Sequence, residues 1–384
     1  MAKLGDICTI QSGGTPSRSN KEYWENGTIP WVKISDFSGK YLYHTSEKIT
    51  QAGLEGSSAK VFTKGTILYT IFATLGETCI LDIDATTNQA IAGLKLNDDS
   101  VLLDYLYYYL LSKKEDVNEI GRGVAQNNIN MKILREMEIA IPPKEEQNKT
   151  TDILNNVYEL IALRKEQLAK LDQLVKSRFI ELFGDPVVNP KFWDTAPLSA
   201  LIVNANNGMA RRGKDADGSI VLRLVELQNG FIDYTAPNRI CLNDTEKKRY
   251  ALVDNDFLFA RVNGNPDYVG RCAVFKSIDE HVFHNDHIIR VHFDEAKING
   301  CFMSVLLNSD YGKRQMREQI KTSAGQYTIS QDGIGAIMAI LPPLELQNQF
   351  ATFVEQTDKS KLEIQKSLEK LETLKKALMQ KSFG

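Results

Sequence analysis

Two long stretches of the chain repeat apolar residues in three- and four-residue steps, with charged residues of both signs between them. This period predicts two amphipathic helices, over 144–184 and 342–384. Each apolar stripe is narrow and nearly heptad, so each helix needs a partner. We expect the two helices to pair as a long antiparallel coiled coil that serves as a spacer; the alternative is that each packs on its own globular domain. The stripe residues are Ile153, Val157, Leu160, Leu168, Leu171, Leu174 and Val175, then Phe353, Ile364, Leu368, Leu371, Leu374 and Leu378.

Shorter segments with other patterns precede each predicted helix. Runs rich in β-branched and aromatic residues predict strands, and two segments have helical periodicity, Val101–Ser112 and Asn299–Gln319. The fold class is therefore α+β, with two mixed α/β globular domains: head 1 over 1–143 and head 2 over 185–341. The expected strands are Lys64–Thr70, Thr78–Ile83, Ile91–Leu96, Asp256–Arg261, Cys272–Lys276 and Ile288–Phe293.

The chain contains an internal repeat. The segment Ile-Pro-Pro-Lys-Glu-Glu-Gln-Asn at 141–148 returns as Leu-Pro-Pro-Leu-Glu-Leu-Gln-Asn at 341–348, an offset of 200 residues. Of the 44 positions in 141–184, 12 are identical to their counterparts in 341–384. Further upstream the offset falls to about 190–197, as expected where loops differ in length. The chain is therefore a duplicated unit, and we expect the two heads to be pseudo-symmetric.

Composition narrows the class of protein. The net charge of −3 does not by itself indicate a nucleic-acid partner, but ten of the fifteen arginines lie between Arg211 and Arg317, so charge is segregated. The five cysteines are far apart and form no Cys-x-x-Cys pair, which favours reduced, buried thiols. No apolar run approaches the length of a membrane span, and Asp6 interrupts any signal-peptide core. We expect a cytoplasmic protein without membrane contact.

Three patterns could carry catalysis or a metal ion, and each is weak. Asn189-Pro190-Lys191-Phe192 is similar to an amino-methyltransferase motif, but no Gly-rich nucleotide loop accompanies it. Pro266-Asp267 with Glu295-Ala296-Lys297 fits the loose spelling of a metal-dependent nuclease. His281, His284, His287 and His292 cluster in sequence, but His284 and His287 would face opposite sides of a strand. We predict no catalytic residue, no metal ligand and no cofactor. We expect these histidines to be exposed polar side chains on the binding edge; the alternative is a structural role.

Polar loops that recur in both heads are the remaining candidates. They combine glycine with hydroxyl, amide and cationic side chains, groups that donate to phosphates and match the edges of bases; the alternative for any one loop is simple solvation. The candidates in head 1 are Gly13, Gly14, Thr15, Ser17, Arg18, Asn20, Lys21, Lys33, Asn88, Gln89, Gln126, Asn127 and Asn128. Those in head 2 are Arg211, Arg212, Lys214, Arg223, Arg261, Asn263, Asn265, His284, Asn285, His287, Gln326 and Tyr327.

An ordered set of short motifs resembles a known family. The set comprises Lys3-Leu4-Gly5-Asp6-Ile7, Gly13-Gly14-Thr15-Pro16, Ile29-Pro30-Trp31-Val32-Lys33, Lys64-Gly65-Thr66-Ile67-Leu68, Asn88-Gln89-Ala90 and the two Pro-Pro segments that begin the long helices. In this order they resemble the specificity subunits of type I restriction–modification enzymes. Head 2 departs from the pattern, with Asn206-Asn207-Gly208-Met209 and Asn285-Asp286-His287 at the corresponding places.

The resemblance implies a division of labour. Each head would read one half of a bipartite double-stranded DNA site, and the helices would set the gap and dock two modification subunits. Those partners would bring S-adenosylmethionine and methylate adenine, and restriction subunits using ATP and Mg²⁺ would cleave DNA. This chain would then be a non-catalytic specificity subunit. The alternative is a coiled-coil scaffold that organises a complex without reading DNA.

Overall fold

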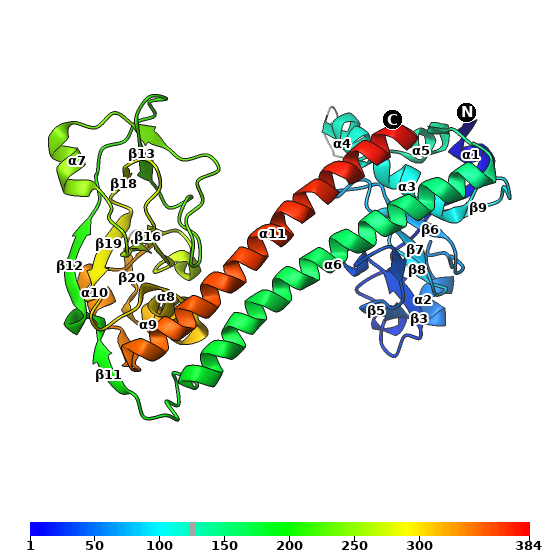
Figure 1. The fold of residues 1–384 in the computed structure, drawn as a ribbon. Coiled ribbons are helices and arrows are strands. Elements are labelled where there is room, and N and C mark those ends of the chain that lie inside the picture. The colour runs from blue at the N-terminus through cyan, green and yellow to red at the C-terminus, as the bar shows by residue number, and fades with distance from the viewer. Residues whose placement is uncertain (123–127, 324) are drawn as a thin grey trace. The chain divides into compact units, whose positions relative to one another are not determined.

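The computed structural model describes residues 1–122, 128–323 and 325–384, which form two compact units. Unit 1 consists of 1–166 and 365–384, and unit 2 of 167–364. Helices α6 (Lys144–Phe183) and α11 (Leu344–Phe383) are continuous over 40 residues each, so the two predicted long helices are confirmed (Figure 1). Each unit thus contains one head together with part of each long helix.

Unit 1 is built on a five-stranded sheet with the order β2-β9-β6-β7-β4. Its strands are β2 (Cys8–Ser12), β9 (Ile91–Leu96), β6 (Ile67–Thr70), β7 (Thr78–Leu81) and β4 (Tyr41–Leu42). A second sheet, β5-β3-β8, consists of β5 (Glu47–Ile49), β3 (Ile29–Val32) and β8 (Thr86–Thr87). Strand β1 (Ala2–Lys3) pairs with β10 (Glu138–Ile139). The helices are α1 (Leu4–Ile7), α2 (Gln51–Glu55), α3 (Leu103–Ser112), α4 (Lys114–Arg122) and α5 (Met131–Glu136).

Unit 2 repeats this topology. Its main sheet has the order β12-β19-β15-β17, from Ile202–Asn207, Ile288–Phe293, Asp256–Ala260 and Cys272–Val274. Its second sheet, β14-β13-β18, comes from Arg239–Ile240, Ser219–Leu222 and Val282–His284. Strand β11 (Asp194–Pro197) pairs with β22 (Met338–Leu341). A third sheet, β16-β21-β20, comes from Val262–Asn263, Gln326–Thr328 and Lys321–Ser323. The helices are α7 (Asp244–Tyr250), α8 (Gly300–Asn308), α9 (Asp310–Gln319) and α10 (Gln331–Gly335).

Strand directions also agree between the units. The pairs β2–β9, β9–β6 and β6–β7 are antiparallel, as are β12–β19, β19–β15 and β15–β17. In both second sheets the middle strand has one antiparallel and one parallel neighbour. The α+β fold class is therefore confirmed. The shared topology of the two units confirms the duplication inferred from the sequence.

Most of the predicted short elements are present. Ile91–Leu96 and Ile288–Phe293 are strands with the predicted bounds, and the other four strands are shorter than predicted by one to three residues. The single helix expected over Asn299–Gln319 was wrong, because the chain breaks at Ser309 into α8 and α9. Ser309 has an extended backbone and its hydroxyl accepts a hydrogen bond from the amide of Gly312 at 3.4 Å, so it caps the second helix.

The long helices pack both on each other and on the heads. In unit 2, Phe179 and Phe183 of α6 contact Phe302 of α8 and Phe350 of α11, with ring centroids 4.7–5.7 Å apart. In unit 1, Phe383 of α11 packs on Tyr105 of α3 at 5.1 Å. Ion pairs join the two helices directly, Lys165–Glu372 at 3.3 Å in unit 1 and Asp172–Lys361 at 2.7 Å in unit 2. Pairing of the helices and packing on the heads thus occur together.

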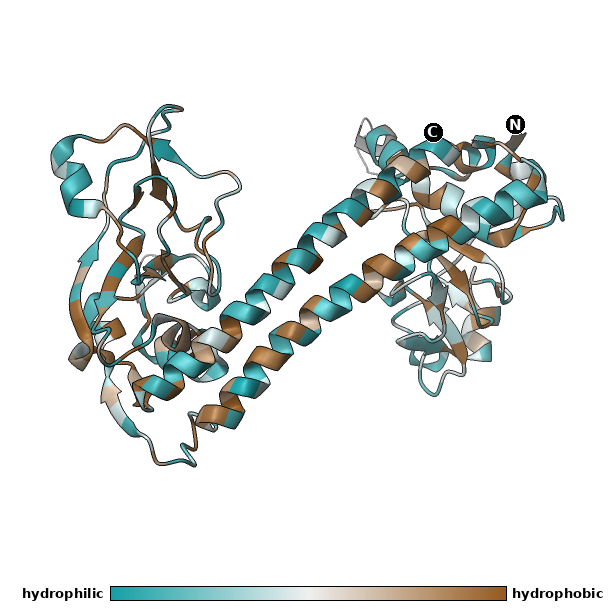
Figure 2. Cartoon of the chain, in the orientation of Figure 1, coloured by the Kyte–Doolittle hydropathy of each residue, from teal (hydrophilic) through white to brown (hydrophobic). Residues whose placement is uncertain are grey.

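The buried stripe of α6 differs from the predicted one. Three pairs of adjacent apolar residues occur in the helix, Ile153-Leu154, Leu160-Ile161 and Leu174-Val175, and in each pair the second residue is the buried one. The predicted stripe residues Ile153, Leu160 and Leu174 are 40–47% exposed, and so is Leu374 of α11. These four assignments were wrong. In α6 the reason is that neighbouring apolar residues give two stripes with the same period, and only packing chooses between them. Figure 2 shows the resulting mixture of hydrophobic and hydrophilic bands along both helices.

Candidate nucleic-acid interface

The strand pairing gathers the predicted polar loops at one end of the main sheet in each unit. In unit 1, the end of β2 and the end of β6 both lie at the beginning of β9, since Ser12 pairs with Ala92 and Thr70 with Ile91. We call this end loop edge 1; it carries 13–20, 88–89 and Asn128, which bridges to Phe72. Gln126 and Asn127 lie outside the described residues.

Unit 2 has a matching loop edge 2. Asn207 at the end of β12 pairs with Ile289, and Ala260 at the end of β15 pairs with Ile288. Loops 208–214, 261–265 and 284–287 therefore meet at this end. The structure thus brings most predicted candidates of each head together, although they are far apart in sequence.

The glycines of loop edge 1 have a steric role. Gly13 and Gly14 are buried, and their amides donate to Ile91 and Thr87 carbonyls at 3.1 and 2.8 Å. A Cβ on Gly13 would lie 1.9 Å from Thr87 Oγ1, and one on Gly14 would lie 2.4 Å from Ser58 Oγ. Two chain segments therefore meet here at a spacing that only glycine permits. Gly13 and Gly14 thus hold the loop that comes after them, and their contact with a ligand stays a prediction.

That loop presents Arg18 on an aromatic platform. The guanidinium carbon of Arg18 lies 3.7 Å from the ring centroid of Trp24 and 4.7 Å from that of Trp31. The two indoles meet edge to face at 5.0 Å. Each indole N–H donates to the loop itself, Trp24 to the Ser17 carbonyl and Trp31 to the Gly14 carbonyl, both at 3.1 Å. The platform therefore fixes both the loop and the plane of the guanidinium.

Glu47 of β5 holds two predicted cations together. Its carboxylate accepts from Lys33 Nζ at 2.8 Å and from Arg18 Nη1 at 2.5 Å. The hydrogen bond from Lys33, followed by that from Arg18, keeps the pKa of Glu47 below its usual range. Sequence reasoning missed Glu47, Trp24 and Trp31; the Trp31-Val32-Lys33 motif was visible, but nothing in the sequence pairs Glu47 with a loop 29 residues upstream.

The other candidates of loop edge 1 make local bonds. Thr15 donates its hydroxyl proton to the amide oxygen of Gln89. The side chain of Asn88 accepts from the Ala90 amide at 3.0 Å, and that of Asn20 caps a short helical turn. Lys21 is exposed and lies 3.8 Å from Glu25. Thr15, Gln89, Arg18 and Lys33 thus form one polar surface, whereas Asn20 and Asn88 shape its turns.

Loop edge 2 also carries an arginine held by a carboxylate. Arg212 Nη2 lies 2.6 Å from Asp286 Oδ1 and 3.2 Å from His287 Nε2. Arg261 Nε donates to the Asp286 carbonyl at 2.6 Å. Burial, reinforced by the charges of Arg212 and Arg261, lowers the pKa of His287, although Asp286 acts in the opposite direction. His287 is therefore a neutral partner near pH 7, and the positive charge of this edge comes from arginine.

Helix α7 extends loop edge 2 with basic residues that sequence reasoning missed. Glu246 of α7 lies 3.0 Å from Arg211, and the Arg249 carbonyl accepts from Asn206 at 3.4 Å. These contacts fix the helix beside the loop. Its Lys247, Lys248 and Arg249 are exposed, as is Lys214 of the loop. The counterpart in unit 1, α2, has no basic residue, so a repeat-based search could not find this feature.

Arg223 and Lys33 occupy corresponding positions after β13 and β3. The amide of Lys33 donates to Asp36 at 3.0 Å, and that of Arg223 donates to Glu226 at 2.8 Å. In addition, the Arg223 guanidinium makes an ion pair of 2.6 Å with Glu226, which is buried. Arg223 is thus tied to its own turn, with 42% of its side chain exposed.

Two candidates of loop edge 2 are buried, contrary to expectation. His284 is 0% exposed and Asn285 is 4% exposed. His284 ends β18 opposite Leu222, beneath Gly208, where an added Cβ would lie 2.3 Å from His284 Nδ1. Burial, with a smaller effect of Arg290, lowers the pKa of His284 to about 3. The prediction that His284 is an exposed polar residue was therefore wrong.

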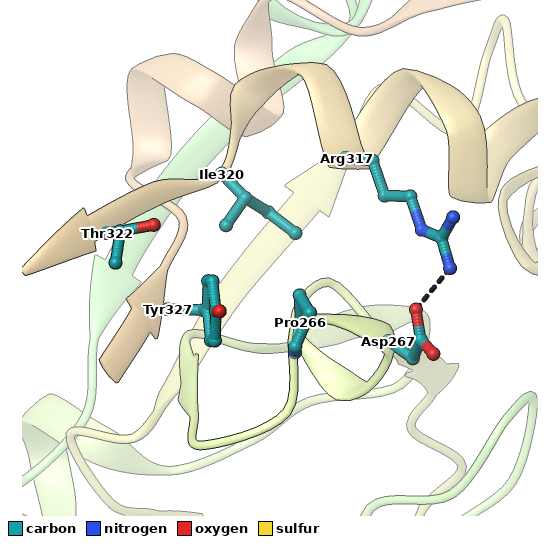
Figure 3. Close-up of a pocket in the computed structure, with 6 residues that line it drawn as sticks. All are labelled: Pro266, Asp267, Arg317, Ile320, Thr322 and Tyr327. Atoms are coloured by element: carbon teal, nitrogen blue, oxygen red, sulfur yellow. Dashed lines mark hydrogen bonds and ion pairs between the residues drawn. The ribbon is translucent and has the colours of Figure 1, made fainter. Parts of the chain in front are cut away.

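The third sheet of unit 2 completes this end of the molecule. The side-chain oxygen of Asn263 accepts from the Asn265 amide at 2.9 Å, and that of Asn265 accepts from the Asp267 amide at 3.0 Å. Gln326 is exposed, and Tyr327 lines an open depression. Figure 3 shows that depression, in which Arg317 of α9 reaches an ion pair with Asp267. Its lining residues are Pro266, Asp267, Arg317, Ile320, Thr322 and Tyr327.

The residues of the nuclease-like and methyltransferase-like patterns do not assemble. Asp267 follows the end of β15 at which β19 begins, whereas Glu295 and Lys297 follow the far end of β19, about 20 Å away along six residues. Asp267 pairs with Arg317, and Lys297 pairs with Asp294 at 3.2 Å. The side chain of Asn189 bonds to both backbone groups of Trp193, at 2.8 and 3.0 Å, and closes a turn.

The four clustered histidines also separate. His281 is exposed, His284 is buried, His287 contacts Arg212 and His292 Nδ1 lies 2.9 Å from Asp256. Over 1–122, 128–323 and 325–384, no three His, Cys, Asp or Glu residues are grouped as metal ligands. Within the same residues, no helix has the length and hydrophobicity needed to cross a bilayer.

Each copy of the duplicated α+β unit thus ends in a polar, arginine-bearing loop edge. Residues 1–173 match the family described as the type I restriction modification DNA specificity domain. The StySPI specificity subunit of Salmonella potsdam is 27% identical over 299 residues, 73% of this chain and 64% of that protein. The MjaIX specificity subunit of Methanocaldococcus jannaschii is 34% identical over 197 residues, 50% of this chain and 45% of that protein. The chain thus spans less than two thirds of the length of these curated relatives.

Solved structures show the same fold. The type I restriction–modification S subunit from M. genitalium has a TM-score of 0.59 at 16% identity, covering 100% of this chain and 95% of that one. A chain from a study of complex assembly and conformational transition of the type I system has a TM-score of 0.60 at 16% identity, covering 100% and 96%. The N-terminal 173 residues are therefore similar to a type I restriction–modification DNA specificity domain, and the chain shares its fold with these solved chains.

Proposed function

We propose that this chain reads a bipartite DNA sequence, with loop edge 1 contacting one half-site and loop edge 2 the other. The observation that carries the proposal is the repeated placement of polar loops at the same sheet end in both units. Each edge presents an arginine held by a carboxylate, Arg18 by Glu47 and Arg212 by Asp286. Such groups match the hydrogen-bonding pattern of base edges in the major groove.

The proposed role in the complex is non-catalytic. Two modification subunits would dock on the helices and bring S-adenosylmethionine, and restriction subunits would bring ATP- and Mg²⁺-dependent cleavage. The chain would act in the cytoplasm, where the DNA is. Different side chains on the two edges would give two different half-sites. Asp286 stands on loop edge 2 where loop edge 1 has Gln89.

The experiment is methylome mapping of cells that carry the chain with its modification subunit. We expect methylated adenines in one motif with two defined halves and an unspecified gap. Exchange of 1–143 for the first head of another specificity subunit should change one half and leave the other intact. A chain that supports complex assembly without any sequence preference would instead be a scaffold, and the proposal would be wrong.

A further inference from the structure

We propose that Arg18 is the base-reading arginine of head 1 and that Glu47 positions it, so that the half-site read by this head contains a guanine. This inference rests on the proposed DNA-reading function and specifies it. Three separate contacts constrain this one side chain: the cation–π contact with Trp24, the cation–π contact with Trp31 and the bond to Glu47. An exposed arginine of an ordinary loop has none of these.

The geometry leaves one edge of the guanidinium for a ligand. Within the part of the chain that the structure describes, Arg18 bonds to Glu47 through Nη1. The guanidinium carbon lies over the Trp24 ring at 3.7 Å and the bond to Glu47 uses Nη1, so Nε and Nη2 form the remaining edge. Two N–H groups in one plane match O6 and N7 of guanine, the commonest specific contact between arginine and a base. More than half of the side chain, 53%, is exposed, so the edge is accessible.

The electrostatics favour a base over a phosphate. Glu47 neutralises one of the two positive charges of Arg18 and Lys33, so the cluster as a whole carries a single net charge. A phosphate contact gains affinity from net charge and tolerates a mobile side chain, as a free lysine does. A base contact depends on a fixed plane and direction, and an arginine with little freedom to lose on binding serves it better. Glu47 therefore lowers the sequence-independent attraction to phosphates and fixes the orientation of the Arg18 guanidinium.

The residues next to Arg18 are also held in place on loop edge 1. Thr15 and Gln89 bond to each other on the loop edge, and Gln89 is exposed. The Ser17 carbonyl accepts from Trp24, so the residue before Arg18 is fixed as well. The backbone that carries Arg18 is thus held from the steric contact at Gly13 onward, which limits the directions that the guanidinium can take.

The test uses the complex with the modification subunit and a DNA library that varies each position of the half-site of head 1. Arg18→Ala should reduce the preference for one guanine by roughly 5- to 150-fold and leave the half-site of head 2 unchanged. Arg18→Lys keeps the charge but not the planar fork, so it should retain overall affinity while losing that preference. Glu47→Gln should weaken the same preference without reducing binding to unrelated DNA, because it adds one positive charge.

Two controls match the charge changes on the same edge. Glu25→Gln removes an exposed carboxylate near Lys21, and Lys48→Ala removes an exposed cation next to Glu47 in β5; neither should alter the preference at any single position. The inference is overturned if the half-site of head 1 contains no G·C pair, or if Arg18→Lys and Glu47→Gln leave every preference unchanged. A wild-type complex without any bipartite preference would instead defeat the proposed function itself, which distinguishes the two failures.

Discussion

Gln147 of α6 accepts a hydrogen bond from the backbone amide of Leu102 at 2.8 Å, and Leu102 is the residue that precedes α3. The amide nitrogen of Gln147 donates to the Ser100 and Pro142 carbonyls at 2.7 and 2.8 Å. Gln347 repeats this in unit 2, where it accepts from Asn299 at 2.8 Å and donates to Lys297 and Pro342. Both glutamines are 0% exposed. One buried amide in each unit therefore joins a long helix to its head.

We expect Gln147→Ala to destabilise unit 1 by about 2–4 kcal/mol, because three buried backbone groups lose their partner and a cavity forms. Chemical denaturation of the full chain provides the measurement. The quantity compared is the free energy of unfolding of unit 1. Asn148→Ala is the matched control, since Asn148 is the exposed neighbour and its loss should change stability by less than about 0.5 kcal/mol. Equal effects of the two variants would show that the bonds of Gln147 contribute little.

The Gln147 contacts illustrate what the sequence could and could not reveal. The repeated Pro-Pro…Gln segment identified two equivalent helix starts, and periodicity placed both helices, because these signals are local. The bonds to Ser100 and Leu102 depend on where α3 packs, 45 residues upstream, and no local pattern specifies that. For the same reason the stripe of α6 was assigned to Ile153 and Leu160 although Leu154 and Ile161 are the buried neighbours.

The candidate site shows the same division. Loop composition indicated Arg18, Lys33, Arg212 and Arg261, and strand pairing brings each set to one sheet end. The carboxylates that hold them could not be foreseen, since Glu47 and Asp286 reach the loops only through the fold. His284 was misjudged because a polar residue in a polar segment reads as exposed, and its burial is set by Gly208 and Tyr250 packed around it.

The burial of His284 predicts acid sensitivity of unit 2. Its pKa is about 3 in the folded chain, against an ordinary value of 6.5 that applies after unfolding. Between these values the unfolded chain binds a proton that the folded chain does not, so stability falls as the pH decreases from 6.5. The expected slope is up to about 1.4 kcal/mol per pH unit, and the effect is absent above about pH 7.

Unfolding of wild type and His284→Phe between pH 7 and 4.5 measures this contribution. Carboxylates titrate in the same window, so the difference between the two proteins is the quantity of interest. It should grow in favour of His284→Phe as the pH falls. His281→Gln is the control, since His281 is exposed and its removal should leave the pH profile of wild type. A pH-independent difference would mean that the pKa of His284 is the same in the folded and the unfolded chain.

The basic residues of α7 should contribute sequence-independent affinity. Replacing Lys247 and Lys248 by alanine in the assembled complex should weaken binding to specific and unrelated DNA by the same factor. The slope of log K against log salt should decrease by about 1–2, since each phosphate contact releases about one counterion. Lys276→Ala is the control. Lys276 is exposed and follows β17 at the end of the main sheet of unit 2 that is opposite loop edge 2. A change in the methylated motif would instead make these lysines part of base recognition.

The last prediction concerns α6 as a ruler between the half-sites. α6 begins in unit 1 and ends in unit 2 without a break in its hydrogen bonding pattern, and the boundary lies between Glu166 and Gln167. Four residues inserted between Glu166 and Val175 add about 6 Å of helix and rotate the downstream part of the chain by roughly 40°. B-DNA advances about 3.4 Å per base pair, so the proposed ruler role predicts a gap longer by one or two base pairs.

The insert must preserve the apolar steps, because Leu168 and Leu171 belong to the partly buried side of the helix. A repeat of the local sequence meets this condition, and a Gly-rich insert of equal length serves as the comparison, since it lengthens the chain without extending the helix. Methylome mapping should show unchanged half-sites and a longer gap for the helical insert alone. If the gap stays the same while methylation persists, the helices hold the partner subunits and the spacing is set elsewhere in the complex.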